Sequence, residues 1–518
     1  MTRKFSRKEF VLLAFLISTA VSANDSLEFR LTEKMGSYPV GLKIVNQYDY
    51  SRTYQYATDE LGKRYHGERA RPIQTLVWYP ASHSGGKPMT VNDYAQLSAI
   101  ETRFDHPTFS PELREWLAGA HDSLATSLRA VRDAPLEPSH FPIVIYAPGA
   151  GDPSWENADL CEYLASYGYV VIASPNRGTT TRAMTFDVGG ANTQARDISF
   201  LIGYAQTLAD TDMTSVAVVG HSWGGLANLF AAARDHRIDA LVTLDGSLRY
   251  YPALVKQAGD VHPEEFTIPL LALLQADYSL ENQARFMTVG QLDGPNVLNA
   301  WTHGDLITVH MLGLAHVNFT SKWQRDLYAW TDSPQFAAAD YRREDGIVAY
   351  GWVARYTRAF LDGYLKHDSA SIDFLKRTPA DNGVPTHVMT VSYRPSEGMP
   401  ISFEGFRAEI GRQGFDHTAD VYATFQQYKS DFKLDDVALS DWINDLIGDN
   451  HSEQALALLK LNVLLHPDSG DAYLRLADAY ALFGQRQLAI DNYKLALQRD
   501  SNGTLAIPVK RKLKLLQQ

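Results

Sequence analysis

The chain has 518 residues, of which 45% are hydrophobic, 11% aromatic and 21% charged. This composition is that of a globular protein and excludes a largely disordered chain, and the length predicts one large domain with at least one smaller unit. The formal net charge of −12 argues against nucleic acid or an anionic membrane as the main partner. Cys161 is the single cysteine, so an internal disulfide is excluded.

The N-terminus has the three-part pattern of a secretory signal peptide. A basic start is followed by an apolar run from Phe10 to about Val21, which is too short for an ordinary membrane span. Small residues then precede Asn24. We therefore predict a signal peptide over residues 1–23, cleaved after Ala23, which leaves no transmembrane segment and places the mature chain in the periplasm or outside the cell. The competing interpretation is an uncleaved N-terminal anchor.

Residues 24–377 are expected to form an α/β domain. From residue 141 onward, short apolar segments typical of buried strands alternate with amphipathic helical segments such as ENADLCEYLASYG. The apolar segments are FPIVIYAPG, YVVIASP, TSVAVVGH, IDALVTLDG, IPLLALLQAD and DLITVHMLG. This alternation predicts a mostly parallel sheet with helices on both faces, whose functional residues gather at the carboxyl ends of the strands. A further strand is expected within RPIQTLVWYPA, a helical insertion near residues 93–140, and a long helix in GIVAYGWVARYTRAFLDGYLKHD.

The C-terminal part differs in character. Residues 378–435 are predicted to be a connector because proline, glycine and polar residues are frequent there. Residues 436–518 contain a repeat with a period of 34 residues, which predicts a small all-α unit of tetratricopeptide-like repeats. The second copy carries the small and large residues of that pattern at Tyr473, Leu476, Ala477, Tyr480, Gly484, Ala489, Tyr493 and Ala496. Two interpretations stay open: a groove that binds a protein partner, and an appendage that stabilises the chain.

A candidate nucleophile lies in the motif Gly220-His221-Ser222-Trp223-Gly224. A Gly-x-Ser-x-Gly pattern alone is weak, because chance produces it fairly often. Here it follows the apolar strand VAVV and opens the small-residue helix GLANLFAAA, which is the strand, sharp turn and helix that the motif requires. We therefore predict that Ser222 is a nucleophile. Serine needs a base to take its proton and an acid to orient that base, and in this fold they follow in the order acid, then histidine.

The base is predicted to be His316, which lies just past the last expected strand. His310 lies inside that strand and is expected to be a packed or edge residue, and His221 is expected to make a local hydrogen bond. Two acids are candidates, because Asp245 and Asp277 each end an expected strand. Position alone leaves both open.

The oxyanion of a tetrahedral intermediate needs two backbone N–H donors. We predict these at Trp223, the residue after the nucleophile, and at Ala150, in the glycine-containing loop after FPIVIYAPG. The competing interpretation of that loop is an ordinary turn. The sequence contains no His-Glu-x-x-His motif, paired cysteines or phosphate-binding loop, so we expect neither a metal nor an organic cofactor.

Six motifs in order resemble those of the platelet-activating-factor acetylhydrolase group of α/β-hydrolases, with dienelactone hydrolases as broader relatives. They are YPVGLKIVNQYDYSR, RPIQTLVWYPA, APGAG, GHSWGG, LDGSL and GLAHVNF, and they cover about residues 37–330. The resemblance implies an α/β-hydrolase fold and hydrolysis of an ester through a serine acyl-enzyme. It also implies Asp245 rather than Asp277 as the acid, His316 within the family's His-x-Asn-Phe segment, and Ala150 at the oxyanion position.

Two departures limit what the resemblance implies. Pro148-Gly149 stands where the family has His-Gly, and the helical tail is not part of the family's core. We therefore expect a secreted or periplasmic serine hydrolase of a small-molecule or lipid-like ester, without carrying over acetyl phospholipid as its substrate. The alternatives are an amidase or peptidase on the same fold, and an inactive binding protein that acts through its tail.

Overall fold

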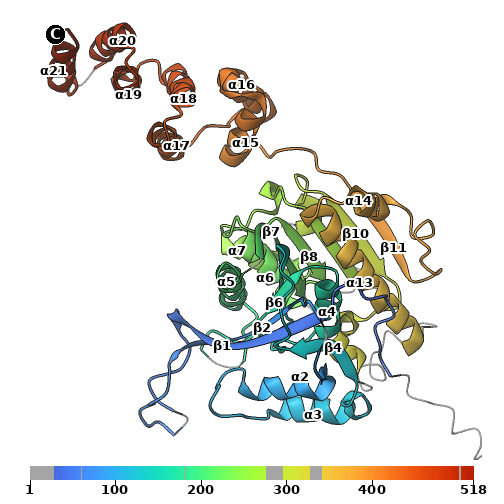
Figure 1. The fold of residues 1–518 in the computed structure, drawn as a ribbon. Helices are drawn as coiled ribbons and strands as arrows, with labels where there is room; N and C mark the ends of the chain where they lie inside the picture. The colour runs from blue at the N-terminus through green and yellow to red at the C-terminus, as the bar shows by residue number, and fades with distance from the viewer. Residues whose placement is uncertain are drawn as a thin grey trace, which may run out of the picture. The chain divides into compact units, whose positions relative to one another are not determined.

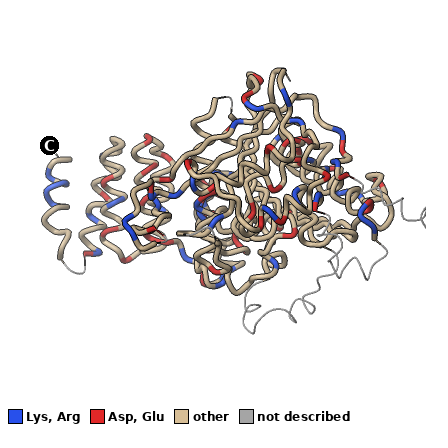
Figure 2. The backbone as a smooth tube through the Cα atoms, turned by 90° about the horizontal axis from the view of Figure 1, so that it is seen from below, with Lys and Arg blue, Asp and Glu red and all other residues tan. Residues whose placement is uncertain are grey.

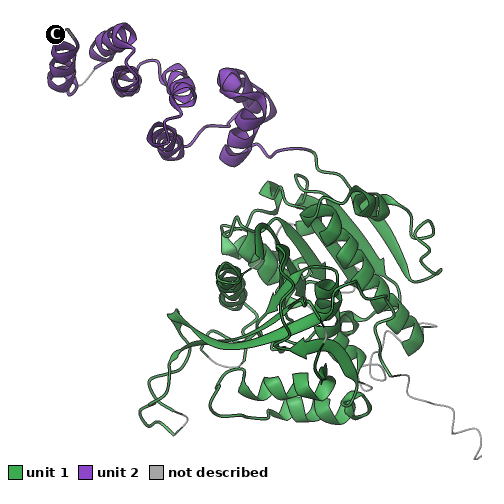
Figure 3. Ribbon diagram, in the orientation of Figure 1, with its two compact units in different colours: residues 1–397 green, residues 398–518 purple. Residues whose placement is uncertain are grey.

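The computed structural model divides into two compact units, residues 1–397 and residues 398–518 (Figure 3). The structure describes residues 28–59, 61–83, 85–180, 183–209, 211–275, 296–326, 341–500 and 503–517. The expected signal peptide lies outside these residues, and so does Asp277.

An 11-stranded sheet forms the centre of the first unit (Figure 1). Its strands are β1 (Val40–Thr53), β2 (Ala70–Pro80), β3 (Pro88–Thr90), β4 (Ser127–Arg132), β5 (Phe141–Ala147), β6 (Val170–Ala173), β7 (Thr211–His221), β8 (Ala240–Leu244), β9 (Leu270–Gln275), β10 (Leu306–Met311) and β11 (Met389–Arg394). They lie in the order β11-β10-β9-β8-β7-β5-β6-β2-β1-β4-β3. The strands from β6 to β10 are parallel, whereas β1, β2 and β11 pair antiparallel with their neighbours in the order, apart from the parallel pair of β1 and β4. The six strands expected from residue 141 onward and the mostly parallel sheet are confirmed.

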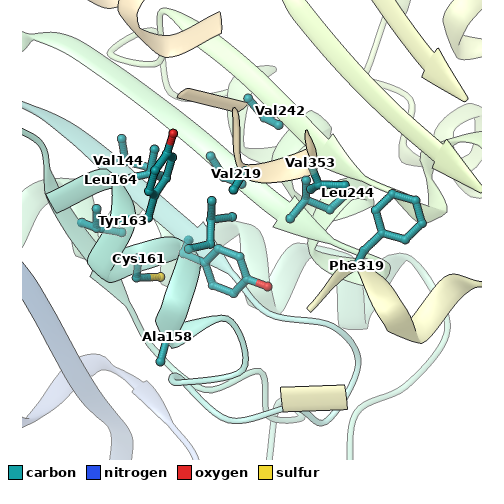
Figure 4. Packing of buried hydrophobic residues seen from close by; sticks show 14 of the residues in the cluster. Val144, Ala158, Cys161, Tyr163, Leu164, Val219, Val242, Leu244, Phe319 and Val353 are labelled. Carbon is teal, nitrogen blue, oxygen red and sulfur yellow. The ribbon is translucent and has the colours of Figure 1, made fainter. Parts of the chain in front are cut away.

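Helices cover both faces of this sheet, because successive side chains of each buried strand point to opposite sides. On one face the strand residues pack against α4 (Ala158–Ser166) and α13 (Arg343–Leu365), and on the other against α5 (Val188–Ala205) and α6 (Trp223–Ala232). Figure 4 shows the first of these cores, to which Val144 of β5 and Leu164 of α4 both contribute. The α/β-hydrolase fold expected from the sequence is thus confirmed.

Residues 93–140 are less helical than the sequence predicts. They contain most of α2 (Val91–Leu97) and all of α3 (Pro111–Gly119), but also the strand β4, which pairs in parallel with β1. In β4, Leu128 and Ala130 point into the core, whereas Ser127 and Arg129 are exposed. This short alternation is what makes the segment a strand, and the helix-forming residues around it conceal it in the sequence.

Residues 378–435, predicted to be a connector, contain regular structure. They include the edge strand β11, which pairs with β10, and the helices α15 (Phe403–Gln413) and α16 (Thr418–Tyr428). The unit boundary at residue 398 falls between this strand and these helices. The shorter helices of the first unit are α7 (Pro252–Ala258), α9 (Val297–Ala300), α10 (Ser321–Gln324) and α14 (Ser369–Lys376).

The second unit is built from helices around one apolar core. After α15 and α16 come α17 (Asp436–Gly448), α18 (Ser452–Leu465), α19 (Gly470–Leu482), α20 (Arg486–Gln498) and α21 (Ala506–Gln517). In α19 and α20, the repeat positions Ala477, Ala489 and Tyr493 are buried. Figure 2 shows acidic and basic residues interspersed in both units. Among the described helices of the whole chain, none has the length and apolar character needed to cross a membrane.

Glu162 is a buried carboxyl in α4, away from the predicted nucleophile. Its oxygens accept hydrogen bonds from the Tyr94 hydroxyl at 2.7 Å and from the Arg129 amide at 2.6 Å. Burial, which disfavours the charged form, nevertheless raises the pKa of Glu162 from 4.5 to about 7. Between about pH 4.5 and 7, the Glu162 carboxyl is therefore mostly protonated in the folded chain and mostly ionised in the unfolded chain.

This proton makes a testable contribution to stability. Because the pKa is raised in the folded state, the contribution is fully present below about pH 4.5 and is lost as the pH rises through about 7. Relative to Glu162→Gln, the wild-type free energy of unfolding should fall by about 3 kcal/mol over this window, since each pKa unit corresponds to about 1.4 kcal/mol. Urea unfolding of both proteins across the pH range measures the difference, and parallel pH curves would contradict the assignment.

Candidate active site

Ser222 lies in the sharp turn between β7, which ends at His221, and α6, which begins at Trp223. Its backbone has φ 51° and ψ −118°, a region that residues other than glycine rarely adopt. Two backbone hydrogen bonds hold the turn: the Ser222 amide donates to the Leu244 carbonyl at 3.1 Å, and the Ser247 amide donates to the Ser222 carbonyl at 2.7 Å. The end of β8 and the residues just after it therefore hold the strained turn in place.

The two glycines of the motif permit close approach of the backbone around this turn. A Cβ on Gly224 would lie 2.0 Å from the carbonyl oxygen of Ala147, and one on Gly220 would lie 2.5 Å from the backbone of Gly224. The first turn of α6 thus packs directly against the end of β5 and against β7. This is the physical reason for the spacing of the motif.

Three predicted residues are joined by hydrogen bonds. His316 Nε2 lies 2.8 Å from Ser222 Oγ, and His316 Nδ1 lies 2.6 Å from Asp245 Oδ2. His316 begins the short 3-10 helix directly after β10, and its side chain is 36% exposed, whereas the Asp245 carboxyl is fully buried. The chain thus brings together a hydroxyl, an imidazole and a carboxyl, with the hydroxyl at the accessible end.

The Asp245 carboxyl has two further donors that the sequence did not indicate. Its Oδ1 accepts from the Tyr250 hydroxyl at 2.9 Å and from the Gln275 amide at 3.1 Å. Burial alone would raise the pKa of Asp245, but the hydrogen bonds and charge of His316, with those two donors, hold this pKa below its ordinary value. Asp245 is therefore ionised at neutral pH and accepts the Nδ1 proton of His316, which leaves Nε2 free to accept a proton from serine.

The two predicted oxyanion donors lie on neighbouring segments. The Trp223 amide is the first N–H of α6, so the helix offers it no carbonyl partner. Ala150 lies in the turn after β5, whose backbone at Ala147 and Pro148 is in contact with Gly224. The turn carrying Ala150 therefore adjoins the helix start that carries the Trp223 amide.

The other two histidines differ from each other. His310 lies in β10 and is half-buried, in line with the packed position expected for it. His221 is buried, and its partners are distant in sequence rather than local: Nδ1 lies 2.8 Å from Glu156 Oε1, and Nε2 lies 3.0 Å from the main-chain oxygen of His316. No signal in the sequence singled out Glu156.

Within the described residues, no three His, Cys, Asp or Glu side chains are grouped so that they could hold a metal ion.

Comparison with known proteins found similarity to two esterases. No protein-family model matches the chain. It is similar to a probable 1-alkyl-2-acetylglycerophosphocholine esterase of Arthroderma benhamiae, with 24% identity over 273 residues that make up 46% of this chain and 64% of the relative. The chain thus spans less than two thirds of that relative's length. A solved structure of a ferulic acid esterase from Streptomyces cinnamoneus aligns with a TM-score of 0.48 and 21% identity, over 70% of this chain and 98% of that one.

The chain thus has an α/β-hydrolase fold, and its sequence is similar to that of the first of these two esterases.

The close approach at Gly224 can be tested by Gly224→Ala. Its methyl group would meet the Ala147 carbonyl, so the first turn of α6 must shift away from β5. We expect the free energy of unfolding to fall by about 3 kcal/mol, measured by urea unfolding. Gly203→Ala is the matched control, because a Cβ there meets nothing within 4 Å and α5 should gain up to about 1 kcal/mol. Equal effects of the two substitutions would contradict the packing argument.

Proposed function

We propose that this chain hydrolyses carboxylic esters through a serine acyl-enzyme, with Ser222 as nucleophile, His316 as general base and acid, and Asp245 as the residue that orients His316. The observation that carries the proposal is the pair of hydrogen bonds that joins them, 2.8 Å from His316 Nε2 to Ser222 Oγ and 2.6 Å from His316 Nδ1 to Asp245 Oδ2. Nucleophile, base and orienting acid within hydrogen-bond reach of one another are the arrangement that activates serine.

The reaction would proceed in two matching halves. Ser222 Oγ attacks the ester carbonyl while His316 Nε2 takes the hydroxyl proton, and the Trp223 and Ala150 amides stabilise the negative oxygen of the tetrahedral intermediate. His316 then returns the proton to the leaving alcohol, which departs and leaves an acyl-Ser222. Water attacks this acyl group with His316 again as base, and the second tetrahedral intermediate releases the acid and restores Ser222.

The proposal includes a place of action and a role for the helical unit. Export to the periplasm or beyond is supported by the signal-peptide pattern of residues 1–23. A small-molecule or lipid-like ester is supported by the similarity to the glycerophosphocholine esterase. For the C-terminal helices, tetratricopeptide-like spacing over residues 436–518 supports a unit that binds a protein partner.

Ser222→Ala tests the nucleophile. We expect turnover of p-nitrophenyl acetate to fall by about 10⁴-fold or more, because the acyl-enzyme has no oxygen on which to form. Initial rates measure the loss, and circular dichroism checks folding. Ser369→Ala, which changes an exposed serine at the start of α14, is the control and should leave the rate unchanged. Undiminished turnover by the Ser222 variant would rule out this nucleophile.

Two assays separate the proposed activity from its alternatives. A fluorophosphonate probe labels an activated serine, so an inactive binding protein would stay unlabelled, whereas we expect wild type to label and Ser222→Ala not to. An ester and an anilide of the same acyl group then distinguish an esterase from an amidase. We expect the ester to be cleaved at least about 100-fold faster, measured as kcat/KM. A faster reaction on the anilide would favour the amidase.

A further inference from the structure

His221, the residue before the predicted nucleophile, links two segments that are far apart in the sequence. Its ring is 2% exposed, so both nitrogens depend on protein partners. Nε2 lies 3.0 Å from the main-chain oxygen of His316, and Nδ1 lies 2.8 Å from Glu156 Oε1. A carbonyl oxygen only accepts hydrogen bonds. Nε2 must therefore carry a proton and donate a hydrogen bond to the main-chain oxygen of His316. The ring therefore holds the backbone of the predicted base directly beside the nucleophile turn.

Glu156 extends this link to the turn that carries Ala150. Its Oε2 accepts from the Tyr146 hydroxyl at 2.8 Å and from the Gly149 amide at 3.1 Å. The same place is tightly packed, since a Cβ on Gly149 would lie 3.0 Å from His221 Nδ1 and 3.1 Å from Glu156 Oε1. Gly149 is the residue before the predicted oxyanion donor, so the carboxyl of Glu156 fixes the backbone that leads into it.

A second pair of bonds joins the same turn to the segment after His316. Lys322 Nζ donates to Asp152 Oδ1 at 2.6 Å, and the Lys322 amide donates to the Glu156 carbonyl at 3.0 Å. Burial alone would raise the pKa of Asp152, but the Lys322 ammonium holds it below its ordinary value. Lys322, in the segment after His316, is thus bonded to the segment after β5 at two positions, Asp152 and Glu156.

The link through His221 does not depend on where its second proton resides. Burial raises the pKa of Glu156, and the Glu156 carboxyl raises the pKa of His221 against the opposing effect of burial. Because Glu156 Oε1 and His221 Nδ1 are 2.8 Å apart, a proton lies between them in a hydrogen bond. Whichever of the two holds it, His221 Nε2 keeps its own proton and its bond to His316.

We propose that His221 is a positioning residue, which sets the main chain of His316 relative to Ser222 and, through Glu156, the turn that carries Ala150. This inference rests on the proposed function. Base and oxyanion donors act chiefly on the transition state, so an error in their placement lowers kcat and leaves KM nearly unchanged. A displacement of about 1 Å at such groups costs on the order of 100-fold.

Two substitutions separate the two bonds of the ring. The amide nitrogen of glutamine occupies about the place of His Nε2, so His221→Gln keeps the bond to the His316 carbonyl. The amide nitrogen of asparagine occupies about the place of His Nδ1, so His221→Asn keeps a bond to Glu156 and loses the one to His316. With p-nitrophenyl acetate, we expect His221→Asn to lower kcat on the order of 100-fold with KM within about threefold of wild type. His221→Gln should keep kcat within about tenfold.

Glu162→Gln is the control, because it likewise changes a buried polar side chain, in α4, but does not touch His221. We expect it to leave kcat unchanged. Should His221→Asn fail to fold, His221→Phe fills the space without a donor and carries the same expected loss. A folded Asn or Phe variant with kcat within threefold of wild type would overturn the proposal, and so would equal losses in the Asn and Gln variants.

The same measurements distinguish a failure of this inference from a failure of the proposed function. A wild type that neither turns over the ester nor labels with the fluorophosphonate would overturn both. An active wild type whose kcat is insensitive to His221 would overturn the positioning role alone and leave Ser222, His316 and Asp245 in their proposed roles.

Discussion

The buried charge of Asp245 is the constraint around which the rest of the site is arranged. A carboxylate without solvent costs several kcal/mol unless hydrogen bonds compensate it, and here three donors do so. The Gln275 amide comes from the end of β9, the Tyr250 hydroxyl from the loop after β8, and Nδ1 of His316 from the loop after β10. The Asp245 backbone also has φ 46°, a positive value that is uncommon for residues other than glycine.

The order of the strands in the sheet explains why Ser222, Asp245 and His316 lie close together. Strands β7, β8, β9 and β10 are consecutive neighbours and parallel, so their carboxyl ends lie in a row along one edge. Ser222 follows β7, Asp245 follows β8 and His316 follows β10. Residues that are up to 94 positions apart in sequence are thereby brought within hydrogen-bond reach. The packing of α6 against β5 then fixes the backbone position of the serine.

The sequence predicted the parallel strands well, because they are buried on both faces and form continuous apolar runs. The strands β1, β4 and β11 were harder to predict, since each is partly exposed and mixes polar with apolar residues. The motifs and their order predicted Ser222 and His316, whereas only the resemblance to the acetylhydrolase group favoured Asp245 over Asp277. The structure brings Ser222, His316 and Asp245 together. Glu156 could not be found in this way, because its role arises from contacts with His221, 65 positions away, and no motif joins the two.

Pro148 stands where the sequence departs from the motif of the family that it resembles. Proline donates no N–H, but its carbonyl accepts from the Gln194 amide group at 2.8 Å and from that of Asn176 at 3.3 Å. Arg177, which is next in the chain, is bonded to the Gly151 carbonyl and to the buried Glu101 carboxyl. Side chains from α5, from the loop after β6 and from the insertion after β2 thus hold the turn on both sides of Ala150. Side chains outside this turn thus hold its backbone in a chain that has Pro148-Gly149 there, and the insertion that supplies Glu101 becomes part of the framework around the turn.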